Sequence, residues 1–324
     1  MYPTLKSLKI ADLFGYKNIT LDFNPVTVIV GKNGIGKTTI LKILNAMLNR
    51  EHCDELRACS SAEVIFDDGQ KISFKTETDD DENNEIKKNI FEKFISSEIK
   101  NNKKVTKEDK ERLNGFLNVM LKNSKIASTI SLRSSSITVS KELRDLLTSS
   151  LKTEFISTIN MSANANQLIK KSDGREGNFL DFEIQDEINS LLQSPTGKHT
   201  RAFVREINKL FVDCEKKITI GKYFSVSVNK TKEKLKFTQL SSGERQLLYI
   251  LAKVANTQNA PTFLLMDEPE ISLHLNWQEQ LLDSIKAINK NCQIVVVTHS
   301  PAIIMNGYMD SYVEMSDITT DSEK

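Results

Sequence analysis

The chain has 324 residues, of which 39% are hydrophobic and 27% charged, and its formal net charge is +1. These values suit a soluble globular protein of about two domains, and they exclude a strongly basic wrapper of nucleic acid and an acidic solvating tail. No apolar run approaches the roughly 18 residues of a membrane span, and the first residues lack the apolar run of a signal peptide. The four cysteines form no CxxC pair, so we expect reduced thiols, a cytoplasmic location and no membrane partner.

The N-terminal part has the pattern of β-structure followed by a loop and a helix. Apolar residues in short extended patterns predict strands around residues 5–10 and 19–23. The run PVTVIV at 25–30 is fully apolar apart from one threonine and rich in β-branched residues, which is typical of a strand buried on both faces. The segment GKNGIGKTT follows, and apolar residues recur at helical spacing from Thr38 onward.

The middle of the chain changes in composition. AEVIFDDGQKISF at 62–74 predicts a hairpin, because Asp68 and Gly69 favour a tight turn between two alternating runs. An acidic polar tract at 76–85 predicts a loop, and helical patterns follow at 86–95 and 113–121. We interpret residues 77–150 as a mainly helical insertion.

The C-terminal half alternates strands and helices. A strand at 152–159, helices around 180–193 and 199–212, and a hairpin from KITIG and YFSVSV come first. LSSGERQLLYILAKVA and WQEQLLDSIKAI then predict helices, whereas TFLLM and QIVVVT predict buried strands. This alternation indicates an α/β fold with a parallel sheet covered by helices. We divide the chain into an N-terminal lobe (1–76), the insertion (77–150) and the remainder of the core (151–324).

Residues 31–38 match the phosphate-binding pattern G-x-x-x-x-G-K-[ST]. In this pattern backbone N–H groups surround the phosphates of a nucleotide, the lysine reaches the β and γ oxygens, and the hydroxyl binds Mg²⁺. A glycine-rich turn could match by chance, but a buried strand before it and a helix after it are the context that the motif requires. We expect contacts to ATP from Gly31, Asn33, Gly34, Gly36, Lys37, Thr38 and Thr39.

An acidic pair and a histidine follow the two C-terminal buried strands. Asp267 and Glu268 end the run FLLMDE. In a phosphate-loop ATPase an acid at this place holds Mg²⁺, and a second carboxylate polarises the attacking water. We therefore expect Thr38 and Asp267 to hold Mg²⁺, and Glu268 to be catalytic together with Lys37. His299 follows the second strand, at the edge of a parallel sheet where ligands bind.

The motif LSSGE at 240–244 begins a predicted helix. Ser241 and Glu244 have the spacing of a capping box, which by itself accounts for the motif as a well-capped helix. The N-terminus of such a helix is also a site that attracts anions.

Taken together, these motifs make the chain resemble the ABC-type ATPases, whose LSGGQ signature is here LSSGE. The resemblance implies an α/β, P-loop ABC-ATPase head with a mixed central sheet, an N-terminal antiparallel β subdomain and a mainly helical insertion. It implies a homodimer or higher oligomer, in which the signature of one subunit contacts the nucleotide on the phosphate loop of the other. It further implies that Ser241, Gly243 and Glu244 make these contacts, that Glu268 is catalytic and that His299 senses the γ-phosphate. The run ISLH at 271–274 resembles the loop that crosses the dimer interface.

Within this family the chain is most similar to the non-transporter branch. The segment between Lys37 and Ser241 is about twice as long as the resemblance implies for a transporter subunit, and DEPEISLH and THSP resemble the overcoming-lysogenization-defect (OLD), RecF and SMC-like ATPases. Relatives of this group serve as ATPase subunits of anti-phage systems such as Septu, PARIS and some retrons. Two departures stand out: the glutamine that lines the γ-phosphate has only weak candidates, Gln167 and Asn160, and we expect no fused nuclease domain after His299.

Three functions follow as alternatives. The first is a Mg²⁺-dependent ATPase that dimerises on ATP and regulates a separate effector protein, a nuclease, in bacterial anti-phage defence. The second is a DNA repair or recombination ATPase that clamps DNA, which keeps nucleic acid open as a partner. The mixed-charge run 100–112 lacks aromatic residues and is more typical of a solvated helix face. The third, an energising subunit of a transporter, is disfavoured by the long insertion.

For adenine stacking, Phe14 and Tyr16 are candidates, with strand packing as an equal alternative.

Overall fold

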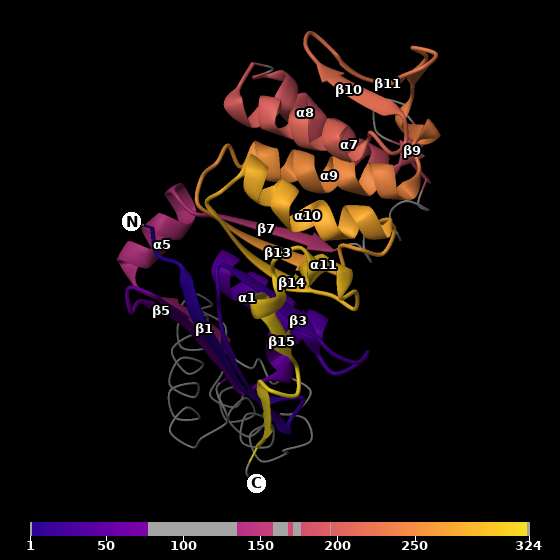
Figure 1. Ribbon diagram of the computed structural model, residues 1–324. Helices are drawn as coiled ribbons and strands as arrows, with labels where there is room; N and C mark the ends of the chain where they lie inside the picture. The colour runs from indigo at the N-terminus through magenta and orange to yellow at the C-terminus, as the bar shows by residue number, and fades with distance from the viewer. Residues whose placement is uncertain (1, 77–134, 158–167, 171–175, 195, 323–324) are drawn as a thin grey trace, which may run out of the picture. The chain divides into compact units, whose positions relative to one another are not determined.

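The computed structural model describes residues 2–76, 135–157, 168–170, 176–194 and 196–322. The chain divides into two compact units, one formed by residues 1–73 and 137–324 and the other by residues 74–136. Nearly all described residues belong to the first unit, shown in Figure 1. The helical patterns predicted at 86–95 and 113–121 lie outside the described residues, as do Asn160 and Gln167.

An antiparallel sheet is formed by the N-terminal strands and the C-terminal end of the described chain. Its strand order is β16-β2-β1-β4-β5-β6. The bounds are β1 (Leu5–Leu13), β2 (Lys17–Asp22), β4 (Ser61–Phe66), β5 (Lys71–Thr76), β6 (Ser135–Val139) and β16 (Thr319–Asp321). The hairpin predicted at 62–74 is confirmed, with Gly69 at a left-handed φ of 86° in its turn.

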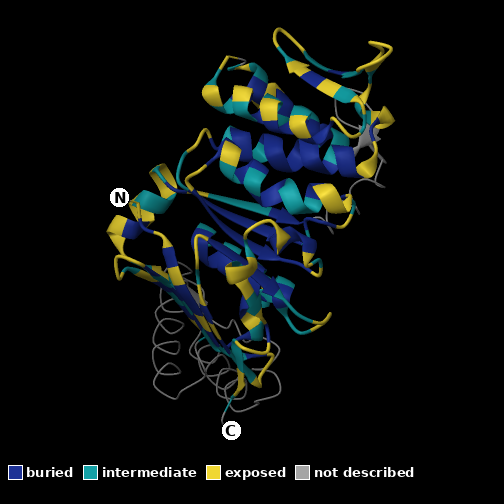
Figure 2. Ribbon diagram, in the orientation of Figure 1, coloured by how far each residue is buried: buried dark blue, intermediate teal, exposed yellow. Residues whose placement is uncertain are grey.

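A second sheet has five strands, all parallel, in the order β15-β3-β14-β13-β7. Its strands are β3 (Val26–Val30), β7 (Lys152–Ser157), β13 (Thr262–Asp267), β14 (Cys292–Val297) and β15 (Tyr312–Glu314). Every residue of β13 and β14 is buried, as their continuous apolar sequences predict for strands covered on both faces (Figure 2).

Helices cover both faces of this parallel sheet. On one face α1 (Lys37–Asn49) packs against β13, β14 and β7 and also against β4 of the other sheet, and all its apolar residues are buried. The other face is covered by α9 (Ser242–Asn256) and α10 (Leu275–Ile288), and α7 (Phe179–Leu192) and α8 (Lys198–Leu210) form an outer layer on α9 (Figure 1). This is the layered arrangement of an α/β domain around one core.

The remaining elements are short or lie at the edges of these layers. They are the helices η1 (Asp54–Ala58), α5 (Lys141–Ser149), η2 (Phe237–Gln239), α11 (Ala302–Met305) and η3 (Met309–Ser311), and the strands β8 (Leu168–Lys170), β9 (Glu176–Asn178), β10 (Lys216–Ile220), β11 (Phe224–Val228) and β12 (Lys234–Leu235). The strands β10 and β11 confirm the predicted hairpin. In the part of the chain that the structure describes, no helix is both long and apolar enough to cross a membrane.

The predicted α/β fold class is confirmed: the five-stranded sheet is parallel, and β16, β2, β1 and β4 pair antiparallel in the other sheet. One local difference concerns the end of the expected insertion at 77–150. Residues Ser135–Val139 form a strand there, and α5 follows it, capped by the Ser140 hydroxyl that accepts from Leu143 N at 3.2 Å. Residues from 137 onward belong to the larger unit. The run of serines at 134–136 obscures the period-two pattern that would have predicted this strand.

Candidate active site

The register of the parallel sheet brings the predicted motifs to one edge. Asp267 of β13 is opposite Val297 of β14, and Val297 is opposite Ile29 of β3. The chain leaves all three strands at this edge, so the phosphate loop, Glu268 and His299 emerge side by side. Ligand sites of open parallel sheets lie at such carboxyl ends.

The phosphate loop has a backbone that requires glycine. Gly34 and Gly36 have φ angles of 79° and 106°, and a Cβ on Gly36 would lie 3.1 Å from the ring of Phe14. Gly36 is the N-cap of α1, and neither an acidic side chain in the first turn nor a side-chain cap occupies the helix N-terminus. Its N–H groups and the positive end of the helix dipole therefore suit a phosphate.

Lys37 is only 5% exposed, and its amino group lies at the centre of the site. Its Nζ donates to the carbonyls of Gly31 (2.7 Å) and Lys32 (2.9 Å), and it lies 3.1 Å from Nε2 of His299. Burial lowers the pKa of Lys37. The nearby carboxylates, Glu268 most strongly, raise this pKa, but the effect of burial is larger.

Thr38 and Asp267 form the pair expected to hold Mg²⁺. The Thr38 hydroxyl donates to Oδ1 of Asp267 at 3.0 Å. Asp267 is fully buried, and burial raises its pKa while the hydrogen bond from Thr38 opposes that rise. The Thr38 hydroxyl and the Asp267 carboxylate are hard oxygen ligands. They therefore fit Mg²⁺, which proteins usually bind through one or two oxygen ligands of their own together with the phosphates of the substrate. Among the described residues, no group of three His, Cys, Asp or Glu side chains could hold a metal.

Glu268 and His299 are in direct contact. Nε2 of His299 lies 3.1 Å from Oε1 of Glu268 and 3.1 Å from Nζ of Lys37. A neutral Nε2 either donates or accepts, so the tautomer of His299 decides whether its ring is bonded to the carboxylate or to the ammonium. Glu268 has a left-handed φ of 49°, and its N–H donates to Val297 O at 2.8 Å. Such strain is concentrated at functional sites.

A cavity of about 280 Å³ lies beside the phosphate loop, Glu268 and His299. It is lined by Phe14, Asn33, Gly34, Gly36, Lys37, Thr38, Thr39, Glu268 and His299. The structure thus brings Phe14 to the loop, with 43% of its surface exposed and a φ of 58°. Tyr16 is not among the lining residues, and Lys17 Nζ lies 5.0 Å from its ring centre.

The signature residues are placed differently, because Ser241, Gly243 and Glu244 do not line this cavity. Ser241 is exposed at the N-cap of α9, and the predicted capping box is present: Ser241 Oγ accepts from Glu244 N (3.2 Å), and Glu244 Oε2 accepts from Ser241 N (2.8 Å). Gly243 is buried, and a Cβ there would lie 2.4 Å from the carbonyl oxygen of Ser272.

The carboxylate of Glu244 is engaged within the chain. Lys216 Nζ donates to both of its oxygens, at 2.7 and 2.8 Å. Burial raises the pKa of Glu244, but the hydrogen bonds from Lys216 and from the Ser241 N–H outweigh burial, and the net pKa is lowered. Lys216 was not singled out from the sequence, where it is one of two adjacent lysines with nothing to distinguish it.

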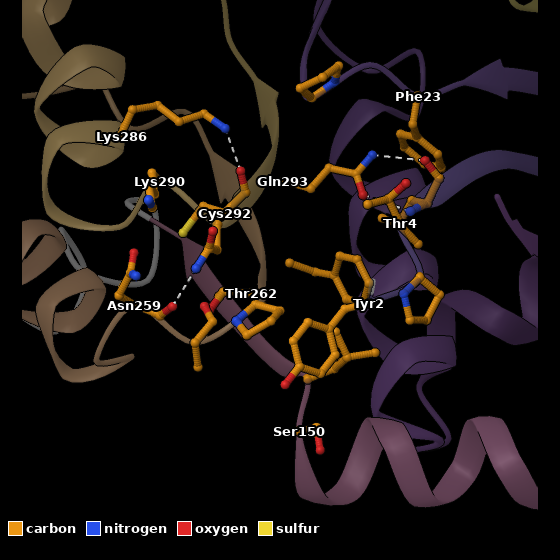
Figure 3. Close-up of a pocket in the computed structure, with 18 of the residues that line it drawn as sticks. Tyr2, Thr4, Phe23, Ser150, Asn259, Thr262, Lys286, Lys290, Cys292 and Gln293 are labelled. Carbon is orange, nitrogen blue, oxygen red and sulfur yellow. Dashed lines mark hydrogen bonds between the residues drawn. The ribbon is translucent and has the colours of Figure 1, made fainter. Parts of the chain in front are cut away.

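A larger cavity lies at the opposite, amino-terminal ends of the parallel strands. It measures about 890 Å³ and contains none of the predicted site residues. Figure 3 shows its walls, where Lys286 donates to Cys292 O at 2.5 Å and Gln293 bonds to the N-terminal strand. These polar groups already have protein partners, and size alone does not make this cavity the catalytic one.

Comparisons with known proteins identify the family of the chain. A family model described as "AAA domain, putative AbiEii toxin, Type IV TA system" (AAA_21) matches residues 26–306. The Septu protein PtuA of Bacillus thuringiensis is 22% identical over 326 positions, which cover 96% of this chain and 75% of PtuA. A retron Ec83 probable ATPase of Escherichia coli is 31% identical over 87 positions, 24% of this chain and 16% of that protein.

Two further matches extend over most of the chain. The spermidine/putrescine import ATP-binding protein PotA of Onion yellows phytoplasma (strain OY-M) is 26% identical over 87% of this chain and 58% of its own length. The chain therefore spans less than two thirds of PotA and of the retron protein. In structure, the Smc head bound to the C-winged helix domain of ScpA superposes with a TM-score of 0.53 at 15% identity, over 94% of this chain and 92% of that one.

The last of these likenesses shows the fold alone, because the identity is low. The family match covers most of the chain, and the predicted resemblance to Septu and retron ATPases is confirmed. The chain belongs to the AAA_21 family, and it is an ATPase-type protein with an SMC-head-like fold that is related to the Septu protein PtuA and to a retron probable ATPase.

Proposed function

We propose that the chain is a Mg²⁺-dependent ATPase that hydrolyses ATP at composite sites in a homodimer and regulates a separate effector protein, a nuclease, in anti-phage defence. The observation that supports hydrolysis is a set of three contacts at one edge of the parallel sheet. Thr38 bonds to Asp267, and His299 contacts both Lys37 and Glu268. The relationship to PtuA supports the defence context.

Each residue of the site has a distinct role in the proposed hydrolysis. The loop N–H groups and Lys37 bind the β- and γ-phosphates, which places the γ-phosphorus close to Glu268. Glu268 accepts a hydrogen bond from the attacking water and orients it, and His299 reports on the γ-phosphate through its Nε2 atom. Thr38 and Asp267 would hold Mg²⁺, which when bound supplies positive charge to the phosphate oxygens.

The signature supports composite sites. Ser241 is exposed at a helix N-terminus, but neither it nor Gly243 lines the cavity of its own chain. A second copy would bring its Ser241 to that cavity from outside, as the ABC resemblance implies. Each site then needs two chains.

Hydrolysis is tested with Glu268→Gln, which keeps the shape of the side chain and removes its carboxylate. We expect ATP binding to persist and kcat to fall by at least about 100-fold, with a dimer trapped in ATP and Mg²⁺. Glu142→Gln, at an exposed position on α5, is the matched control and should behave as wild type. Wild-type kcat in Glu268→Gln would remove its catalytic role.

The proposal that each ATP site is formed by two chains is tested by mixing two inactive variants. Lys37→Ala loses the phosphate-loop lysine, and Ser241→Arg blocks the signature, so each variant alone should be inactive. A heterodimer of the two contains one intact site, and the mixture should regain activity. A mixture as inactive as its components argues against sites shared between chains.

The relationship to PotA favours one competing function, the energising of a transporter. The two readings differ in the partner. Gentle co-purification from the native host should yield a nuclease if the chain regulates an effector, and a membrane protein if it energises transport.

A further inference from the structure

Glu270 connects two strands of the site through a single carboxylate oxygen. Its Oε1 accepts from the Thr298 hydroxyl (2.6 Å), from His299 N (2.9 Å) and from Ser300 N (3.2 Å). Glu270 is 8% exposed and lies in the segment between β13 and α10, whereas the three donors follow β14. The carboxylate therefore bridges the exits of two neighbouring parallel strands.

The strand pairing alone does not fix the backbone at His299. The ladder between β13 and β14 ends at the pair of Asp267 and Val297, and the Thr298 N–H still donates to Ile29 O at 3.1 Å. At His299 the N–H donates to Glu270 instead of to a strand. The backbone position of His299 thus depends on a side chain.

The segment that carries Glu270 is itself held in place. Leu273 N donates to Glu270 O at 2.8 Å, which closes a turn. Gln246 of α9 donates through Nε2 to Pro269 O at 2.5 Å, and both groups are buried. Glu270 is consequently attached to the core of the domain and can act as a fixed acceptor.

A purely stabilising role explains this carboxylate poorly. Oε2 of Glu270 is buried and has no hydrogen-bond partner among the described residues. A buried polar oxygen without a partner costs stability, so a side chain selected only for stability would not retain it. The carboxylate of Glu270 accepts a hydrogen bond from the backbone of His299. The ring of His299 in turn contacts Lys37 and Glu268.

We infer that Glu270 is a positioning residue, which holds the backbone of His299 so that its imidazole lies between Lys37 and Glu268. The inference rests on the proposed hydrolysis of ATP at this site. Displacement of a catalytic group by about 1 Å can reduce a rate by about 100-fold. Glu270 therefore affects kcat through His299, without touching ATP.

Three variants test this in the full chain. Glu270→Asp keeps the charge but is one methylene shorter and does not reach the three donors, and Glu270→Ala removes the acceptor. We expect both to lower kcat by about 10- to 100-fold, with KM for ATP within about threefold of wild type. Glu270→Gln keeps an oxygen that accepts the same bonds and should recover kcat to within about threefold. Wild-type kcat in Glu270→Asp, or a Glu270→Gln variant as slow as Glu270→Ala, would overturn the inference.

A double-mutant cycle separates positioning from general damage. If Glu270 acts through His299, the change Glu270→Asp should alter kcat less than about twofold in a His299→Ala background. A structural role unconnected with His299 would instead give effects that multiply. Additive free-energy changes in the cycle would contradict the proposed connection.

A readout without ATP keeps this inference distinct from the proposed function. The chain has four histidines, so the imidazole signals are few, and His299→Ala identifies the signal of His299. Glu270→Asp should shift that signal and leave those of His52 and His199 unchanged. An unmoved His299 signal overturns the inference. A moved signal in a protein that does not hydrolyse ATP supports the positioning and refutes the ATPase proposal alone.

Discussion

Gly243 allows a stability prediction that is independent of nucleotide. A Cβ at this position would lie 2.4 Å from the carbonyl oxygen of Ser272, and the ring of Trp277 lies 3.4 Å away. An ordinary carbon–oxygen contact needs about 1 Å more, and the obstacle is backbone, so α9 and the segment before α10 must separate. Overpacking of this kind costs about 1–3 kcal/mol, and the better helix propensity of alanine offsets at most about 1 kcal/mol of it. Gly243→Ala should therefore be destabilised by about 1–2 kcal/mol.

The assay is thermal unfolding of the purified chain without ATP. At about 2–4 °C per kcal/mol for a domain of this size, Gly243→Ala should melt about 2–8 °C below wild type. Ser242→Ala is the matched control, because Ser242 is the exposed neighbour on the same helix turn, and its Tm should change by less than about 1 °C. Equal Tm values for the two variants would show that Gly243 has no packing role within its own chain. ATPase activity of Gly243→Ala should fall as well, since α9 presents the signature.

Three further predictions concern the other groups of the site. Thr38→Val removes the hydroxyl that donates to Asp267, and kcat measured across a Mg²⁺ titration should fall by about 100-fold or more. Phe14→Ala should weaken ATP binding by about tenfold in calorimetry, while Tyr16→Ala stays within about twofold; equal effects would refute stacking on Phe14. Lys216→Met leaves Glu244 buried without its cation and should lower the urea unfolding free energy by about 3–5 kcal/mol at pH 7. Because the folded pKa of Glu244 is lowered, its contribution is present above the unfolded pKa of about 4.3, and the difference between wild type and variant should shrink as the pH falls through the lowered pKa.

The sequence predicts those parts of the molecule whose signals are local. The buried strand, glycine loop and helix of residues 26–49 are adjacent in the chain, and their patterns define them without tertiary information. The same holds for β13 and β14, whose apolar runs identify them as parallel central strands. Since parallel strands share one carboxyl edge, the meeting of Asp267, His299 and the phosphate loop could be predicted before any geometry was known.

Contacts between distant segments could not be predicted in this way. The pairing of Lys216 with Glu244 depends on how the hairpin β10–β11 lies near the start of α9, and the three bonds to Glu270 depend on the exits of two strands. Phe14 and Tyr16 are equivalent in sequence, but in the structure the ring of Phe14 lies beside Gly36 and lines the cavity, whereas Tyr16 does not line it. The roles assigned to the site residues stay predictions until the variants above are measured.

The position of β3 between two strands from the C-terminal part of the chain has a consequence for how the protein is made. Its two neighbours in the sheet are β14 and β15, which begin at Cys292 and Tyr312. At about 5–20 residues per second, a ribosome adds them on the order of 10 to 60 s after β3 has been synthesised. During that interval the apolar run of β3 has neither of its hydrogen-bonding strands, and such an unpaired edge invites aggregation. The phosphate loop follows this strand directly, so it too depends on a strand whose partners in the sheet are synthesised late.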